Sequence, residues 1–346
     1  MTLFISTGIA LDNTVKEAVH DSGIEVGSYM YELYPKMCEL LINSKSDNTV
    51  KSYFNSYKRW ERFITLQGHK SLPAQPVHVA LYLTHLLNNN STCHPISNAV
   101  YGIKWAHEIN GLSDPTSNTF VTSILEASKR VAPKKTEKKD PITPETLIEL
   151  CDMFKNSLDL LVVRDLTMMI LSFSGFLRYD EVSSLRFCDV KVHESHLILC
   201  IEKSKTDQYR QSSEVLISKG NSSACPYTMF LRYTRLAGFS DSCQKFFYLF
   251  RPIYRSRNTC KLITKDKKLS YTAARESILK RIRTICPDGN IGLHSFRSGG
   301  ATMAANADVS DRCLKKHGRW KSDSSKDGYI VDSTEKRLKI SKVLGL

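Results

Sequence analysis

Apolar positions recur every three or four residues through most of the chain, which is the period of helices that bury one face. Residues 28–42 carry this period near the start, within an extension that spans residues 1–45. Four further segments follow closely, at residues 46–68, 75–87, 94–109 and 116–131. Because they are short and consecutive, these four segments predict a compact helical domain over residues 46–131.

One helix of this domain carries an aromatic stripe, formed by Tyr53, Tyr57, Trp60 and Ile64 at helical spacing. Such a stripe could stack on nucleic acid bases. It is more typical of a helix that faces a core, and we expect these side chains to form the core of the helical domain.

The second half of the chain is also mainly helical, but one stretch has a different period. Residues 158–176 predict a long buried helix that Gly175 ends. Residues 190–217 alternate between apolar and polar positions, which predicts two or three strands of a small sheet. From residue 226 the helical period returns. The fold class expected is therefore mainly α with a small β-sheet or hairpin.

A polar stretch separates the two halves. Residues 132–143, "APKKTEKKDPIT", hold four lysines between prolines, which is typical of a linker. Its lysines could follow a phosphate backbone or only solvate a flexible segment. The expected organisation is an extension (1–45), a helical domain (46–131), a linker (132–143) and a larger domain (144–346).

Composition excludes several classes of protein. The chain has 346 residues, of which 41% are apolar and 24% charged, as in globular proteins. It has no run of about 18 apolar residues, so no membrane span is expected. Its apolar start lacks a basic flank, so no signal peptide is expected. The ten cysteines include no C-x-x-C pair, which favours reduced thiols in the cytosol or nucleus.

Positive charge gathers toward the C-terminus. The net charge is +14, and residues 251–346 hold 22 lysines and arginines against 9 aspartates and glutamates, a difference of +13. Residues 1–45 hold 3 against 6, a difference of −3. This asymmetry favours a polyanionic partner, most simply nucleic acid. A basic face without a partner is the alternative.

A cluster with zinc-ligand residue types lies at the start of the alternating stretch. It consists of Cys188, His193, His196 and Cys200. Alternation along strands would point neighbouring members to opposite faces. Core thiols and turn histidines therefore explain the cluster better than zinc does.

Several polar residues lie where apolar ones would be expected. Arg178 directly follows the buried helix, so its guanidinium needs an anionic partner, either a ligand or Asp180 or Glu181. Lys203 and Lys205 lie beyond a strand, where a hairpin could carry one of them into a cleft or leave both in a solvated turn.

The stretch "LHSFRSGG" places His294 and Arg297 three residues apart at the start of a helix, which predicts that both project from one face. They could hold a phosphate, or form capping pairs with Asp288 or Glu276. Further on, His317 ends a helix. Tyr329 follows two glycines and small polar residues, so we expect it on a flexible segment rather than in a core.

Together these residues have one common use. Arginines bind the oxygens of a phosphodiester, a histidine accepts a proton, a lysine donates one, and a tyrosine can act as a nucleophile. No cluster of acidic residues for magnesium accompanies them in the sequence, which disfavours metal-dependent nuclease chemistry. No metal and no cofactor are expected.

The order Arg, Lys, His-x-x-Arg, His, Tyr resembles the tyrosine recombinase (phage-integrase-like) family. "GFLRYDEVSSLRFCDV" is similar to the first arginine box of that family, and "LHSFRSGGATMAANADVSDRCLKKHGRWKSDSSKDGYI" to the second. The resemblance covers residues 46–335. Within the family, "HSFRSGGATMAA" and "HGRWKS" resemble the eukaryotic mobile-element recombinases of the Crypton and Ngaro type, which implies a nuclear protein.

The resemblance implies a role for each residue. Arg178 and Arg297 are the two box arginines, His294 opens the His-x-x-Arg motif, and His317 takes the position that is His or Trp in relatives. Tyr329 is the nucleophile. The family pattern Ser-Lys-Thr selects Lys205 rather than Lys203 as the general acid.

The implied activity is DNA cleavage and rejoining through a 3′-phosphotyrosine bond, without metal or ATP. The helical domain then acts as the core-binding domain of a two-domain, C-shaped clamp on double-stranded DNA. Family members act as tetramers, so residues 334–346 are expected to pack on a neighbouring copy. The family does not explain residues 1–45.

Two rival functions share most of these features. One is a DNA-binding protein that descends from a recombinase and no longer cleaves, since residues 301–320 could also form a helix-turn-helix. The other is a type IB topoisomerase, which shares the tyrosine chemistry. Strand transfer between two DNAs, rather than relaxation of one, distinguishes a recombinase from both.

Overall fold

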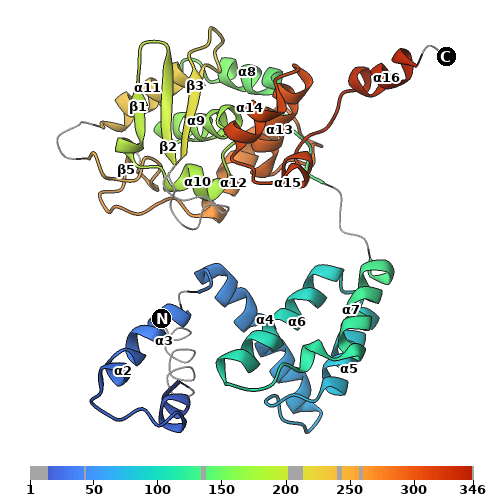
Figure 1. Cartoon of the computed structure of the whole chain (residues 1–346). Coiled ribbons are helices and arrows are strands. Elements are labelled where there is room, and N and C mark those ends of the chain that lie inside the picture. The colour runs from blue at the N-terminus through green and yellow to red at the C-terminus, as the bar shows by residue number, and fades with distance from the viewer. Residues whose placement is uncertain are drawn as a thin grey trace. The chain divides into compact units, whose positions relative to one another are not determined.

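The computed structural model describes residues 15–42, 44–133, 138–201, 213–239, 244–256 and 260–344 (Figure 1). The chain divides into two compact units, Met1–Glu137 and Lys138–Leu346. Among the described residues, no helix is both long enough and apolar enough to cross a membrane.

The described part of the first unit contains helices and no strand (Figure 1). Its helices are α2 (Tyr29–Glu32), α3 (Tyr34–Ile42), α4 (Asp47–Leu66), α5 (Pro76–Asn88), α6 (Cys93–Ile109), the 3-10 turn η1 (Pro115–Ser117) and α7 (Thr119–Val131). Helix α4 packs against α6, and α5 packs against α7.

The core of this unit forms where the aromatic stripe predicted it. Ser46 caps α4 by accepting a hydrogen bond from the backbone N–H of Thr49. Two turns and more into the helix, Tyr57, Trp60 and Ile64 are buried. The prediction that this stripe is core is therefore confirmed.

The extension contains more helix than the sequence predicted. Residues 15–21 are helical, and the segment expected as one helix is divided between α2 and α3 at Leu33. Pro35 is the second residue of α3, where its missing N–H breaks no helical hydrogen bond. Val15, Val19 and Cys38 form a small buried cluster there.

The second unit combines helices with two small sheets (Figure 1). Its helices are α8 (Pro144–Met153), α9 (Leu160–Ser174), α10 (Tyr179–Ser184), the 3-10 turn η2 (Phe187–Asp189), α11 (Pro226–Ala237), α12 (Tyr271–Ile282), α13 (His294–Asn306), α14 (Asp311–Gly318), α15 (Asp323–Asp327) and α16 (Thr334–Val343). Its strands are β1 (Val190–Val192), β2 (His196–Ile201), β3 (Ser213–Ser218), β4 (Ile253–Arg255) and β5 (Cys260–Leu262).

Helix α9 runs through the centre of the second unit. It packs against α10, α11, α12 and α13, and most of its residues are buried. The buried set includes two charged residues, Arg164 and Asp165, which form an ion pair of 2.7 Å. Ser277 and Arg281 also donate to the Asp165 carboxylate, so this buried charge is fully surrounded by donors. The prediction of a long buried helix that ends at Gly175 is confirmed.

Strands β1, β2 and β3 form an antiparallel sheet in that order, as the alternation predicted. Leu197 pairs with Ile217 and Leu199 pairs with Val215, and all four side chains are buried in the main core. The expectation of helix alone after residue 226 is wrong, because β4 and β5 form a second antiparallel pair. Each has only three residues, which is too short for alternation to be recognised.

The border between the two units falls within the stretch expected to be a linker. Its last part is bonded to the loop before α13 and to the first turn of that helix: the backbone N–H of Asp140 donates to the carbonyl of Asn290, and that of Ile142 to the carbonyl of Ser295. Residues 138–142 thus run along the second unit.

Candidate active site

The loop after α9 presents a row of backbone carbonyls. The last carbonyls of a helix have no backbone N–H partner within the helix, and here basic side chains donate hydrogen bonds to carbonyls at and beyond the helix end. His317 Nε2 donates to the Ser174 carbonyl at 2.8 Å. Arg319 donates to the Gly175 carbonyl at 3.3 Å and to the Phe176 carbonyl at 3.0 Å. Arg297 also donates to the Phe176 carbonyl. The loop that leads to Arg178 is therefore held by three side chains from α13 and α14.

Glu181 gathers three arginines around one buried carboxylate. Its Oε1 lies 2.8 Å from Arg178, and its Oε2 lies 2.8 Å from Arg319 and 3.8 Å from Arg297. The backbone N–H of Arg178 also donates to Oε2 at 2.9 Å. The Glu181 side chain is 1% exposed. Burial alone would raise the pKa of the Glu181 carboxyl, but the three guanidinium groups and this N–H hold it below its usual value.

Arg297, the arginine of the second box, is fully buried and contacts the loop of the first box. It donates to the Gly318 carbonyl at 2.7 Å, and its guanidinium carbon lies 4.7 Å from the Trp320 ring centroid. Burial lowers the pKa of Arg297, with Arg178 acting in the same direction and Glu181 opposing it. These contacts fix the orientation of the Arg297 guanidinium within the site.

Two glycines explain how α13 comes so close to this loop. A Cβ on Gly299 would collide with the backbone carbonyl of Ile142, and one on Gly300 with that of Phe173. Only residues without a side chain allow this approach. The "RSGG" sequence thus lets Arg297 reach the carbonyl of Phe176.

Tyr329 lies directly after α15 and turns back onto α13. Its ring centroid lies 5.8 Å from that of Trp320 and 4.9 Å from the guanidinium carbon of Arg297. The ring is partly buried against a cluster formed by Phe176, Ala301, Leu314 and Trp320. The expectation that Tyr329 lies outside any core is therefore wrong: its ring covers the apolar and cationic groups of α13 and α14.

Four of the expected site residues come together in this way. Arg178 and Arg297 meet at Glu181, Arg297 meets Tyr329, and His317 packs edge-on against Phe176 with its ring centroid 4.6 Å away. Burial lowers the pKa of His317, and the hydrogen bond to Ser174 opposes this. Arg178 does pair with Glu181, as one alternative proposed.

His294 and Arg297 do not share an environment. His294 is the exposed first residue of α13, whereas Arg297 is fully buried. Three residues fall short of the 3.6-residue turn, so the two directions differ by about 60°. The partners of Arg297 are backbone carbonyls and Glu181, rather than Asp288 or Glu276. Lys203 and Lys205 lie outside the described residues.

Two further residues of the site, Arg319 and Trp320, were given no role from the sequence, and Glu181 was expected only as a possible partner of Arg178. Arg319 takes a left-handed conformation with a φ of 56° after α14, which turns its side chain back to the loop. The Trp320 side chain is buried, and among the described residues its indole N–H has no hydrogen-bond partner. A tryptophan within the polar run "KKHGRWKSDSS" is the signal that could have identified it.

The structure also shows how the four residues with zinc-ligand side chains are arranged. Across the described ranges, which include Cys188, His193, His196 and Cys200, no group of three or more His, Cys, Asp or Glu side chains is arranged to hold a metal ion. His193 and His196 stack on each other with ring centroids 4.7 Å apart.

Known proteins resemble the chain in sequence and in fold. Over 294 residues it is 26% identical to an integrase/recombinase xerD homolog of Selenomonas ruminantium, covering 84% of this chain and 83% of that protein. No protein-family model matches the chain.

Three solved structures share the fold. The Tn1549 transposon integrase in complex with transposon right end DNA gives a TM-score of 0.60 at 10% identity, covering 96% of this chain and 99% of that one. The XerH site-specific recombinase bound to palindromic difH substrate gives 0.57 at 12%, covering 99% and 96%. A lambda integrase dimer bound to a core site gives 0.53 at 14%, covering 88% and 94%.

Proposed function

We propose that the chain is a tyrosine recombinase, which its similarity to the xerD homolog supports, and that it cleaves and rejoins DNA through a covalent bond between Tyr329 and a DNA phosphate. The observation that carries the proposal is the position of the Tyr329 ring beside Arg297, which joins Arg178 at Glu181. A nucleophile and two phosphate-binding groups thus lie in one site.

In the proposed reaction, the Tyr329 oxygen attacks the phosphorus atom and the bond from phosphorus to the 5′ oxygen breaks. The products are a 3′-phosphotyrosine and a free 5′-hydroxyl. His294 accepts the phenolic proton, and Lys205 supplies a proton to the departing oxygen. Attack by a 5′-hydroxyl of another strand reverses the step, so that strands are exchanged without metal or ATP.

Charge on the pentavalent phosphorus is stabilised by Arg178, Arg297 and one donor from the α14 region. We assign this donor to Trp320, because its buried indole N–H lacks a hydrogen-bond partner within the described residues. His317 has its Nε2 committed to the Ser174 carbonyl. In this assignment His317 holds the loop that carries Arg178. Trp320 donates the hydrogen bond to the phosphate that the resemblance suggested for His317.

The proposed DNA contacts use both units. Within the first unit, residues 46–131 take the role of a core-binding domain, and the lysine-rich residues 132–143 follow the DNA backbone. The +13 difference over residues 251–346 provides most of the attraction for phosphates. Double-stranded DNA is the proposed substrate.

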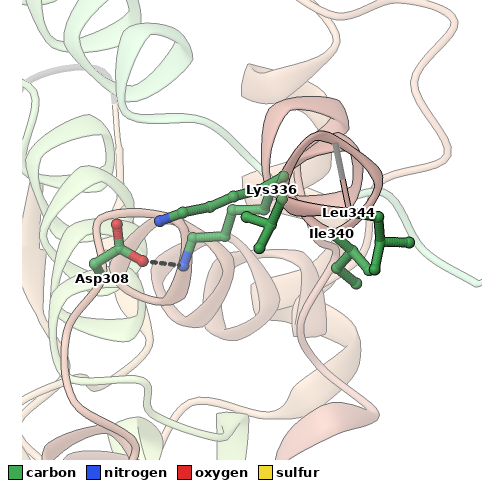
Figure 2. A pocket seen from close by; sticks show the side chains of 6 residues that line it. Asp308, Lys336, Ile340 and Leu344 are labelled. Atoms are coloured by element: carbon green, nitrogen blue, oxygen red, sulfur yellow. Dashed lines mark ion pairs between the residues drawn. The ribbon is translucent and has the colours of Figure 1, made fainter. Parts of the chain in front are cut away.

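We propose that the active assembly on DNA is a tetramer in which α16 packs on a neighbouring copy. Within α16, all of which is described, no residue is buried, and Ile340 and Val343 are more than 70% exposed. An ion pair of 2.7 Å between Lys336 and Asp308 joins α16 to the rest of the second unit (Figure 2). A helix with an open apolar face is suited to a protein partner.

The wording of "HSFRSGGATMAA" and "HGRWKS" supports a narrower proposal. We place the chain among the eukaryotic mobile-element recombinases of the Crypton and Ngaro type, which act in the nucleus.

Strand transfer tests the proposed function. Two labelled duplexes that carry the same target site are incubated with the protein, beside a supercoiled plasmid. Joint products between the duplexes are the expected result. Relaxation of the plasmid without joint products would make the chain a type IB topoisomerase, and DNA binding with neither product would make it a non-catalytic descendant.

A further inference from the structure

A line of polar side chains on α13 holds the backbone that carries the nucleophile. Ser298, Thr302 and Asn306 are four residues apart, so they lie along one face of the helix. Ser298 Oγ donates to the Tyr329 carbonyl at 2.6 Å, and Thr302 Oγ1 donates to the same carbonyl at 3.3 Å. We call these three side chains the α13 ladder.

The α13 ladder continues beyond Tyr329 with the same pattern. The backbone N–H of Val331 donates to Thr302 Oγ1 at 3.1 Å, and Asn306 Nδ2 donates to the Val331 carbonyl at 3.2 Å. The backbone N–H of Ser333 donates to Asn306 Oδ1 at 3.2 Å. Thr302 and Asn306 therefore each donate and accept, as a backbone group pair does in a sheet.

The spacing explains why a helix can do this. Side chains four residues apart on a helix are separated by about 6 Å along its axis. Backbone groups two residues apart on an extended chain are separated by about 6.6 Å. The α13 ladder thus matches every second residue of an extended segment, at residues 329, 331 and 333.

A second anchor of a different kind lies before the nucleophile. The Lys326 ammonium is buried and pairs with Asp311, and Asp327 lies 3.4 Å from it. The side chains of both aspartates are more than half exposed, so salt screens this anchor. The α13 ladder is uncharged, which makes its hold independent of ionic strength.

We propose that Ser298, Thr302 and Asn306 are positioning residues. They fix the backbone at Tyr329, so that the Tyr329 hydroxyl acts at the site formed by Arg297 of the same chain. This inference rests on the proposed function. Since the α13 ladder contacts the Tyr329 backbone, it acts on the rate of cleavage of bound DNA. Its loss lets the ring leave Arg297 without removing a charge that attracts DNA.

Thr302→Val tests the proposal, because it removes the hydroxyl and keeps the shape. Single-turnover formation of the covalent complex, measured at saturating suicide DNA substrate, is expected to slow by about 10- to 100-fold. The dissociation constant for DNA is expected to stay within about twofold, since phosphate contacts dominate affinity. Hydrogen exchange at the Val331 amide is expected to accelerate, because this N–H loses its acceptor.

Two variants serve as comparisons. Thr302→Ser restores the hydroxyl and is expected to recover the cleavage rate. Thr167→Val also removes a buried hydroxyl, which bonds to the Val163 carbonyl on α9, and is expected to leave cleavage unchanged. Should Thr302→Val not fold, Ser298→Ala removes the hydrogen bond to the Tyr329 carbonyl and decides the matter with the same measurements.

The outcomes separate the two proposals. A wild-type protein that forms no covalent complex contradicts the proposed function. A wild-type protein that forms it, with Thr302→Val or its substitute equally fast, contradicts the role of the α13 ladder alone. A slower variant that serine does not rescue, or one that loses DNA affinity by the same factor, also contradicts positioning.

Discussion

The guanidinium carbon of Arg297 lies 4.9 Å from the centroid of the Tyr329 ring in the same chain. A cation at this distance is attracted by the aromatic ring. The proposed nucleophile and a proposed phosphate-binding group are therefore in contact within one chain. Glu181 and Trp320 also contact Arg297, and each of these contacts can be tested separately.

Arg297→Lys tests whether this position needs a guanidinium group, with its several N–H donors in one plane. Lysine keeps the charge, but one ammonium does not reproduce the separate bonds to the Phe176 and Gly318 carbonyls. We expect covalent complex formation to fall by about 100-fold or more, measured by gel shift under denaturing conditions. Arg312→Lys, at an exposed position of α14, is the control and should cleave normally.

Glu181→Gln tests the carboxylate that gathers the arginines. Breaking a buried ion pair costs about 3–5 kcal/mol, so the variant should have a lower free energy of unfolding at pH 7. Glu149→Gln, at an exposed position of α8, should match the wild type. Equal stability of the Glu181 and Glu149 variants would show that the carboxylate is not needed to hold the arginines.

The same carboxylate predicts a pH dependence. Its pKa is lowered in the folded protein, so its contribution to stability is complete above the ordinary carboxyl value of 4.5 and is lost as the pH falls below it. Urea unfolding of the wild type between pH 6 and pH 3, read by circular dichroism, should therefore show a steeper loss of stability than Glu181→Gln. Parallel curves for the two proteins would contradict the lowered pKa.

The sequence was sufficient for residues whose role follows from their chemical type. Arg178, Arg297 and Tyr329 were proposed as site residues from their order and motifs, and the structure brings them together. The buried helix 158–176 was predicted from its apolar run. The sheet was predicted because two of its strands, β2 and β3, have six residues each and are long enough to alternate.

Residues whose role depends on the path of the backbone could not be predicted from the sequence. Arg319 reaches the loop after α9 only because of its left-handed φ, and Glu181 could be recognised as a common partner only once three separate segments were seen to meet. The burial of the Tyr329 ring was missed for a similar reason. Small polar neighbours predicted exposure, whereas α13 supplies the hydrogen bonds that turn the segment inward.

Trp320→Phe tests the donor assigned to the indole N–H. Phenylalanine keeps an aromatic ring beside Arg297 but removes the N–H, so cleavage should slow by about 10²-fold while DNA affinity is retained. Trp320→His returns a ring N–H and should recover part of the rate. If Trp320→Phe cleaves normally and His317→Phe does not, the donor is His317, as the sequence first suggested.

The general acid is tested with a modified substrate. Lys205→Ala should slow cleavage strongly on ordinary DNA and should be rescued by a 5′-phosphorothiolate link, whose sulfur leaves without a proton. Lys203→Ala should cost little and show no rescue. The reverse pattern would exchange the two roles, and the absence of rescue in both variants would place the acid elsewhere.

The central claim is that Tyr329 forms the covalent bond to DNA, and peptide mapping of the trapped complex tests it most directly. The protein is incubated with a suicide substrate, digested, and analysed by mass spectrometry beside Tyr329→Phe. We predict a 3′-phosphonucleotide on the peptide that contains Tyr329, and no adduct in Tyr329→Phe although it binds DNA with nearly unchanged affinity. An adduct on another residue, or one that persists in Tyr329→Phe, would contradict the account.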